Sequence, residues 1–251
     1  MILRKIIICL FSALLILFFF SAFANFGRDT ATDLASAQDR TRNVEDRLSA
    51  IRTMGQSGDE SHSDPLVRML RDKGEDRRVR AGAVIALAES GKPRATIIEA
   101  YEEVYRDRKT GENLRYTILL SIGTLKATEA QALVAEALSG DDDRIRFKAA
   151  QALGMIGGDD AVNLLVSRLE PERDRMVRAE IVRALGRSES ASVEGVLVWA
   201  LKTDPEPLVR YNAALSLAQF KSLGAEGREA LRVAAEDPSL MVRKGAQEAG
   251  R

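Results

Sequence analysis

Histidine, the side chain most often used for acid–base and metal chemistry near neutral pH, is scarce in this sequence. His62 is the single histidine, and it lies in the polar stretch GDESHSDP, where we expect a solvated turn. A histidine-dependent nucleophile triad or a multi-histidine metal site would have to be built on this residue alone. We therefore predict no catalytic residue, no metal ligand and no cofactor-binding residue.

Two acidic clusters could be considered as cation or carboxylate sites. They are the three aspartates at 141–143 and the pair at 159–160. Both stand where a helix is expected to begin, and carboxylates there cap free backbone N–H groups and meet the positive end of the helix dipole. Neither has EF-hand spacing, and no glycine-rich phosphate loop is present. We interpret both clusters as helix caps.

A recurring arginine is the strongest pattern in the chain. It opens seven similar segments at intervals of 31 to 35 residues. The seven are Arg47, Arg80, Arg115, Arg146, Arg178, Arg210 and Arg243. Such a period indicates stacked helical units, each of which buries its apolar face only against its neighbours.

The residues around each arginine have the spacing of an amphipathic helix. With the residue before the arginine counted as zero, apolar side chains fill positions 0, +4, +5 and +8 in most units, for example Ile145, Ala149, Ala150 and Leu153. At about 100° per residue these positions share one face. Glycine stands at +9 in four units, where we expect it to end the helix in a left-handed conformation. These glycines are Gly55, Gly123, Gly154 and Gly186.

A second apolar segment follows each arginine segment. The expected second helices cover 64–72, 93–106, 128–138, 159–169, 190–201 and 224–235. Trp199, between Val198 and Leu201, is expected in the core. No run alternates as a strand would, so the sequence predicts an all-α chain.

Two stretches carry a resemblance to a known family. DDDRIRFKAAQALGMIGGDDAVNLLVSRL (141–169) and DPEPLVRYNAALSLAQF (204–220) resemble HEAT repeats of the short type typified by phycobilisome lyases. The resemblance covers roughly residues 43–250. It implies an α-solenoid, a right-handed superhelix of HEAT-like helical hairpins. This repeat serves many unrelated proteins, so the resemblance does not imply one activity.

The resemblance also implies a structural role for the recurring arginine. In such repeats it pairs with an aspartate six residues earlier or in the next unit, and Asp204 and Asp237 stand six residues before Arg210 and Arg243. Gly74, Gly140 and Glu172 occupy the matching positions before Arg80, Arg146 and Arg178. Those three arginines are therefore expected to be freer to contact a ligand.

Aromatic residues gather two positions after position 0, on the side away from the apolar stripe. This column includes Tyr116, Phe147 and Tyr211, each directly after a recurring arginine. Aromatic and arginine side chains anchor protein interfaces, although such rings can also lie down over the next repeat. The predicted partner-binding residues are Arg115, Tyr116, Arg146, Phe147, Arg210 and Tyr211. The second-helix face carrying Tyr101 and Tyr105 is the next candidate.

The N-terminus has the layout of a secretory signal peptide. Arg4 and Lys5 precede an apolar run, and Ala22 and Ala24 are the small residues that a signal peptidase requires. We expect residues 1–24 to be removed, with an uncleaved membrane anchor as the alternative, because residues 6–26 are long enough to span a bilayer. Either arrangement places the repeats outside the cytoplasm, in the periplasm or secreted. Residues 25–42 are polar, and their composition favours a linker over a frayed first helix.

Charge argues against a nucleic-acid partner, because 37 Lys and Arg are balanced by 37 Asp and Glu. The sequence thus predicts an exported scaffold in residues 43–251 that binds another protein or peptide, without catalysis and without a cofactor. The alternatives are a lyase- or chaperone-like enzyme accessory built on the same repeats, and a membrane-tethered structural spacer.

Overall fold

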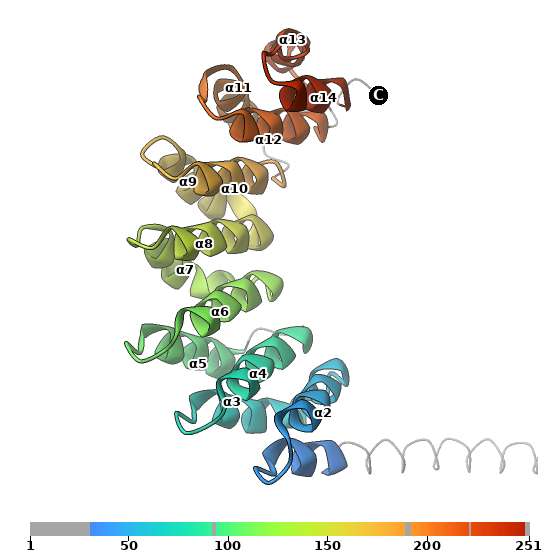
Figure 1. Ribbon diagram of the computed structural model, residues 1–251, viewed down its shortest axis with the longest axis vertical. Coiled ribbons are helices and arrows are strands. Elements are labelled where there is room, and N and C mark those ends of the chain that lie inside the picture. The colour runs from blue at the N-terminus through green and yellow to red at the C-terminus, as the bar shows by residue number, and fades with distance from the viewer. Residues whose placement is uncertain (1–30, 92–93, 189–191, 221, 249–251) are drawn as a thin grey trace, which may run out of the picture. The chain divides into compact units, whose positions relative to one another are not determined.

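The computed structural model describes residues 31–91, 94–188, 192–220 and 222–248 (Figure 1). The predicted signal peptide, residues 1–24, lies outside these ranges. The chain divides into two compact units, with the boundary between Ala86 and Leu87 inside one helix. The described residues include no strand, as expected for an all-α chain.

The first unit holds three α-helical segments and the beginning of a fourth. Residues 31–38 are helical. They are followed by α2 (Val44–Gln56), η1 (Glu60–His62), α3 (Ser63–Arg71) and α4 (Arg77–Glu89), the last of which continues past the boundary. Ala37 is buried, so residues 31–38 of the predicted linker 25–42 form a helix that packs against the fold, whereas residues 25–30 lie outside the described ranges.

The second unit is a series of helical hairpins. Its elements are α5 (Ala95–Arg106), α6 (Glu112–Thr124), η2 (Thr128–Ala130), α7 (Gln131–Leu138), α8 (Asp143–Ile156), α9 (Gly158–Leu169), α10 (Arg175–Leu185), α11 (Ser192–Thr203), α12 (Pro207–Ala218), α13 (Ala225–Ala234) and α14 (Leu240–Glu248). The helices that carry the recurring arginine in their first turn, here called arginine helices, pack in succession from α6 through α8, α10 and α12 to α14 (Figure 1). The helices between them form a second layer, in which α7 contacts α9 and α11 contacts α13.

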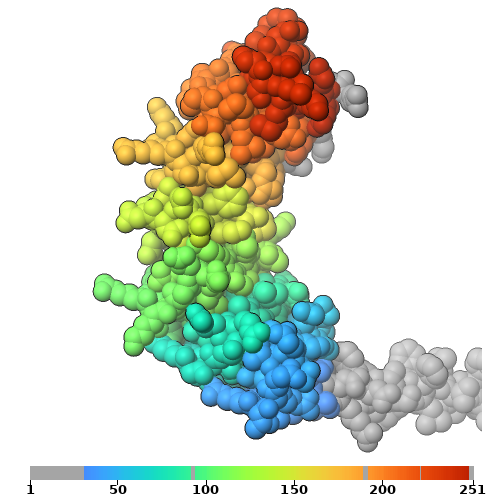
Figure 2. Space-filling view, viewed as in Figure 1, coloured from blue at the N-terminus to red at the C-terminus, as the bar shows by residue number. Residues whose placement is uncertain are grey.

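In the second unit, the colours follow one another in bands along the stack in the space-filling view, because segments close in the sequence pack together (Figure 2). The core of the second unit includes the predicted apolar columns of the arginine helices, in which Ile118, Leu153, Leu185 and Leu217 are fully buried, together with second-layer side chains such as Leu133 and Leu197. Burial of this stripe against the neighbouring helices is the main force that holds each hairpin in the stack.

The glycines at position +9 have a role that differs from the predicted one. Of the described glycines, those with a positive φ are Gly58, Gly91, Gly157 and Gly158, none of which is in the +9 column. The +9 glycines instead face the next arginine helix of the same unit. A Cβ on Gly154 would lie 2.7 Å from the Cβ of Ala184, too close for two carbon atoms.

The same contact recurs along the chain. Gly55 faces Ala86, Gly123 faces Ala152, and Gly186 faces Ser216. Each partner stands at position +7 of the next repeat and is itself small. At these four contacts, two small residues therefore meet between neighbouring arginine helices.

Trp199 also departs from its predicted place. It lies on α11, and 44% of its surface is exposed, whereas Val198 and Leu201 on the same helix are buried. The prediction of a core tryptophan was wrong because second-layer helices keep one face on the solvent.

Candidate functional site

The guanidinium of Arg146 is buried at the start of α8 with every nitrogen bonded. Its Nε and Nη2 atoms donate to the two carboxylate oxygens of Glu172, at 2.8 and 3.0 Å. Its Nη1 atom donates to the backbone carbonyls of Gly140 and Asp141, at 3.1 and 2.7 Å. Arg146 is 8% exposed, so the prediction that it is free for a ligand carboxylate was wrong.

Arg178 and Arg210 repeat this arrangement one and two repeats further along. Arg178 is bidentate to Asp204 and Arg210 is bidentate to Asp237, with all four N···O distances between 2.8 and 3.1 Å. In the first unit Arg47 is bidentate to Glu75 at 2.9 and 2.7 Å. Bidentate arginine–carboxylate pairs combine a charge-assisted bond with fixed geometry. These arginines therefore tie one repeat to the next.

From Arg178 to Arg243, the residue six positions before the arginine contributes two different acceptors, a backbone carbonyl and a side-chain carboxylate. Its backbone carbonyl accepts a bond from the arginine of its own repeat, as Asp204 does from Arg210 and Glu172 does from Arg178. Its carboxylate accepts from the arginine of the preceding repeat. Gly140 therefore leaves Arg115, and not Arg146, without a carboxylate among the described residues. Arg115 instead donates to the backbone carbonyls of Tyr105 and Asp107, both at 3.1 Å.

Arg80 is buried as well, so it is not a free cation either. Its Nε donates to the carbonyl of Leu70 at 2.8 Å within the first unit. All three arginines that were expected to be freer are thus engaged in the fold.

Glu172 has the most perturbed acidity of these groups. Burial alone would raise the pKa of Glu172, but hydrogen bonds from Arg146, the Asp174 backbone N–H and Arg168 outweigh it. Together they lower the pKa from 4.5 to about 2. A strongly held carboxylate of this kind is an ion-pair anchor and not a proton carrier at neutral pH.

The side chains of the predicted aromatic column are only partly exposed to solvent. Tyr116 on α6 and Phe147 on α8 are each half-buried, on helices that pack directly together. The Tyr116 hydroxyl donates to Glu112 at 3.3 Å, and the Lys148 ammonium lies 5.5 Å from the centre of the Phe147 ring. The Tyr211 ring packs against α14: a Cβ added to Gly245 would lie 2.8 Å from one of its ring carbons.

A basic cluster that the column analysis missed lies beside Phe147. It comprises Lys148 on α8, Arg183 on α10 and Arg187 just after α10, and we call it the α8–α10 basic cluster. The three stand at positions +3, +6 and +10, on the face away from the apolar stripe. Sequence reasoning followed only the position next to the arginine and therefore did not find them.

Three other predicted features have different surroundings from those expected. His62 is 3% exposed, with its Nδ1 3.2 Å from the Ser57 hydroxyl and 3.3 Å from the Met54 carbonyl, so the solvated turn was wrong. Tyr101 is fully buried and Tyr105 nearly so. Burial raises the pKa of both tyrosines, and the face that carries them is core and no alternative binding surface.

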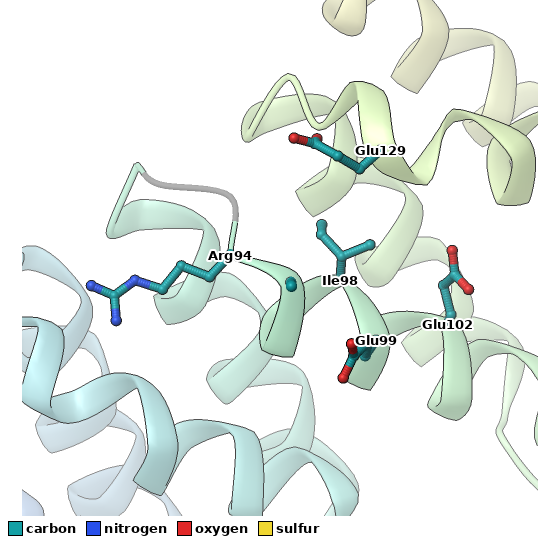
Figure 3. A pocket seen from close by; sticks show the side chains of 6 residues that line it. Arg94, Ile98, Glu99, Glu102 and Glu129 are labelled. Atoms are coloured by element: carbon teal, nitrogen blue, oxygen red, sulfur yellow. The ribbon is translucent and has the colours of Figure 1, made fainter.

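A pocket on the second unit brings three carboxylates near one another. It is lined by Arg94, Ile98, Glu99, Glu102 and Glu129, at the start of α5 and on η2. The carboxylates point in different directions, and Arg94 points away from them (Figure 3). Across the described ranges, no three His, Cys, Asp or Glu side chains are grouped as a metal site would need.

Asp142 and Asp174 act as helix caps. Asp142 accepts from the backbone N–H of Ile145 at 2.9 Å, and Asp174 accepts from Met176 and Val177. This agrees with the interpretation of residues 141–143, whereas Asp159 and Asp160 lie in the first turn of α9, whose N-cap is Gly157 without a side-chain cap bond. None of the helices in the described residues is long and apolar enough to cross a bilayer.

Comparison with known proteins places these repeats in a family. A family model of HEAT repeats matches residues 32–98, 104–186 and 163–249. A HEAT repeat-containing taxis protein of Halobacterium salinarum is 39% identical over 77 residues, which are 31% of this chain and 19% of that protein. The matched part is thus a small fraction of that relative's length.

Two solved structures show the same fold at low sequence identity. The complex of CpcE and CpcF of phycocyanin lyase from Nostoc sp. is 17% identical with a TM-score of 0.53, covering 88% of this chain and 93% of that one. YibA of Escherichia coli is 14% identical with a TM-score of 0.52, covering 91% and 96%. At these identities the likeness is one of fold alone.

Proposed function

The chain belongs to the HEAT-repeat family, and we propose that it is an exported scaffold that binds another protein or peptide through the outward face of its arginine helices. The resemblance to HEAT repeats and the α-solenoid fold expected from it are confirmed. A helical repeat scaffold presents a continuous ridged surface, on which side chains from successive repeats can act together.

One observation carries the proposal. Tyr116 and Phe147 occupy the same column on two contacting helices, and both rings remain partly exposed. Partly exposed aromatic side chains on a rigid surface are typical anchors of protein interfaces, because they bury much area with little loss of conformational freedom. Arg146 and Arg210 no longer belong to this surface as ligand groups, since the fold saturates them.

Photo-cross-linking in the native envelope tests the proposal. A benzoyl-phenylalanine placed at position 116 or 147 should yield a discrete cross-linked partner. The same residue at position 199 replaces Trp199, a more exposed aromatic on the second layer, and should not yield this product. The same product from all three positions, or none from 116 and 147, would overturn the proposal.

A substitution tests the same surface by affinity. Tyr116→Ala with Phe147→Ala should weaken capture of the cross-linked partner at least tenfold, because interface anchors contribute about 2 kcal/mol or more each. The helical circular-dichroism signal should be retained, since both rings lie outside the apolar stripe. Trp199→Ala is the matched control. Full capture by the double variant would assign the rings to packing.

A further inference from the structure

The α8–α10 basic cluster surrounds a single buried carboxylate. Glu180 on α10 is 3% exposed, and it accepts from Nε of Arg183 at 2.8 Å and from Nη2 at 2.6 Å. Burial raises the pKa of Glu180, while the positive charges of Arg183, Arg187 and Lys148 act against that rise. The cluster and Glu180 together therefore hold three positive charges and one negative charge.

The cations of the cluster converge from two helices. A Cβ on Gly154 of α8 would lie 3.4 Å from Nη1 of Arg187, so this guanidinium reaches across onto α8. Lys148 reaches over the Phe147 ring and also lies 3.3 Å from the amide oxygen of Gln151. Among the described residues, neither Lys148 nor Arg187 forms an ion pair.

In the columns that carry the cluster, the described residues add no negative charge beyond that of Glu180. The remaining side chains at positions +2, +3, +6 and +10 of α6, α8, α10 and α12 are hydroxyl, amide, thioether, aromatic or aliphatic, for example Thr117, Gln151, Asn212 and Leu215. Glu180 is the single carboxylate in these columns. The face is thus basic in its centre and aromatic at its side, although the whole chain has no net charge.

We infer that the α8–α10 basic cluster, with Phe147 beside it, binds an acidic peptide segment of a protein partner. The inference rests on the proposed function and specifies the chemistry of the partner. Arginine and lysine beside an aromatic ring suit a segment in which aspartate or glutamate alternates with an apolar residue. A nucleic acid is a poorer fit, because phosphate backbones need rows of cations and three here cannot make one.

A displayed library of random peptides, selected on the purified repeat domain, tests the inference. The selected peptides should be enriched in Asp and Glu, and their binding should weaken as ionic strength rises through the range where screening becomes strong. Lys148→Gln with Arg187→Gln should weaken the best peptide at least tenfold by fluorescence anisotropy. This pair leaves the Arg183–Glu180 ion pair intact, so the fold of α10 is preserved.

The control is Arg173→Gln with Lys202→Gln, which removes the same charge from exposed positions outside this face. It should bind the selected peptide as the wild type does. Peptides without acidic enrichment, equal weakening by both double variants, or displacement of the peptide by random single-stranded DNA would each overturn the inference. If Phe147→Ala abolishes binding while Lys148→Gln with Arg187→Gln does not, this surface binds the peptide but does not select acidic residues. That result would overturn the inference about the partner's chemistry.

Discussion

The guanidinium of Arg146 bonds to two kinds of acceptor, and only one of them depends on a side chain. The carbonyls of Gly140 and Asp141 would accept from it whatever residues stood there. Glu172 supplies the opposite charge from the next repeat. Because the Arg146 guanidinium and the Glu172 carboxylate are almost completely buried, removing one leaves the other as an uncompensated buried charge. This costs far more free energy than losing a surface ion pair.

Glu172→Gln should therefore be among the most destabilising polar substitutions. We expect a loss of about 3 kcal/mol in the free energy of unfolding at pH 7, measured by urea denaturation, because Arg146 and Arg168 lose their shared counter-charge. Glu229→Gln removes half of an exposed pair with Arg232 on α13 and should leave the free energy unchanged within error. Equal effects of the two substitutions would contradict the anchoring role.

The pH dependence of the same contribution follows from the lowered pKa of Glu172. A folded-state pKa below the unfolded one stabilises the fold above the unfolded pKa, and this stabilisation is lost as pH falls through the folded pKa. The pKa falls from 4.5 to about 2, so the loss occurs between those two pH values. The stability difference between wild type and Glu172→Gln should shrink as pH falls across this window.

The sequence predicted the ion-pair partners of the arginines only in part. The spacing of six correctly identified Asp204 and Asp237 as ion-pair partners. It also predicted that Arg146 lacks a carboxylate partner, whereas it is Arg115 that lacks one among the described residues. A carboxylate at this position faces the preceding repeat while its own carbonyl faces its own arginine. Linear spacing cannot separate a backbone contact within a repeat from a side-chain contact between repeats.

At the scale of the elements, the +9 glycines set how closely neighbouring arginine helices approach. Gly154 and Ala184 leave no room for a further methyl group between α8 and α10. Close approach of small residues lets the flanking apolar side chains of both helices interdigitate, and tight packing of this kind is sensitive to a single added carbon.

Gly154→Ala should accordingly destabilise the protein, although alanine is the better helix former. We expect a loss of about 1–3 kcal/mol in thermal or urea unfolding, because the added methyl forces α8 and α10 apart. Gly195→Ala on α11 is the matched control. A Cβ there meets no atom within 4 Å, so alanine should be neutral or stabilise by up to about 1 kcal/mol. A stabilised Gly154→Ala variant would contradict the contact.

The sequence predicted where the helices lie, but it did not predict which side chains on their outward faces are exposed. The expected second helix 159–169 is observed as α9, Gly158–Leu169, because an apolar period of 3.6 residues fixes the buried face. Trp199 and His62 were misplaced because burial at a loop or an outer face depends on what neighbouring repeats leave uncovered. That depends on the three-dimensional packing of the neighbours and is not encoded in a periodic pattern.

At the scale of the whole molecule, the removal of residues 1–24 as a signal peptide is a prediction that mass spectrometry can test. If residues 1–24 are a signal peptide, the intact mass of the protein extracted from its native host should correspond to a chain that begins at Asn25. A mass that includes residues 1–24 would favour the membrane anchor instead. Ala24→Asp offers a control, because it removes a small residue that the peptidase needs and should leave the precursor uncleaved.

The pairing between repeats also makes them interchangeable. Glu172 and Asp204 hold the same place in consecutive repeats, as Ala184 and Ser216 do opposite the glycines. Excision of residues 172–203 would bring Asp204 to Arg146 and Ser216 to Gly154, which recreates both contacts across the new junction. A shortened chain with helical content per residue equal to that of the parent would show that length can change by whole repeats without redesign, as recombination between similar repeats would require.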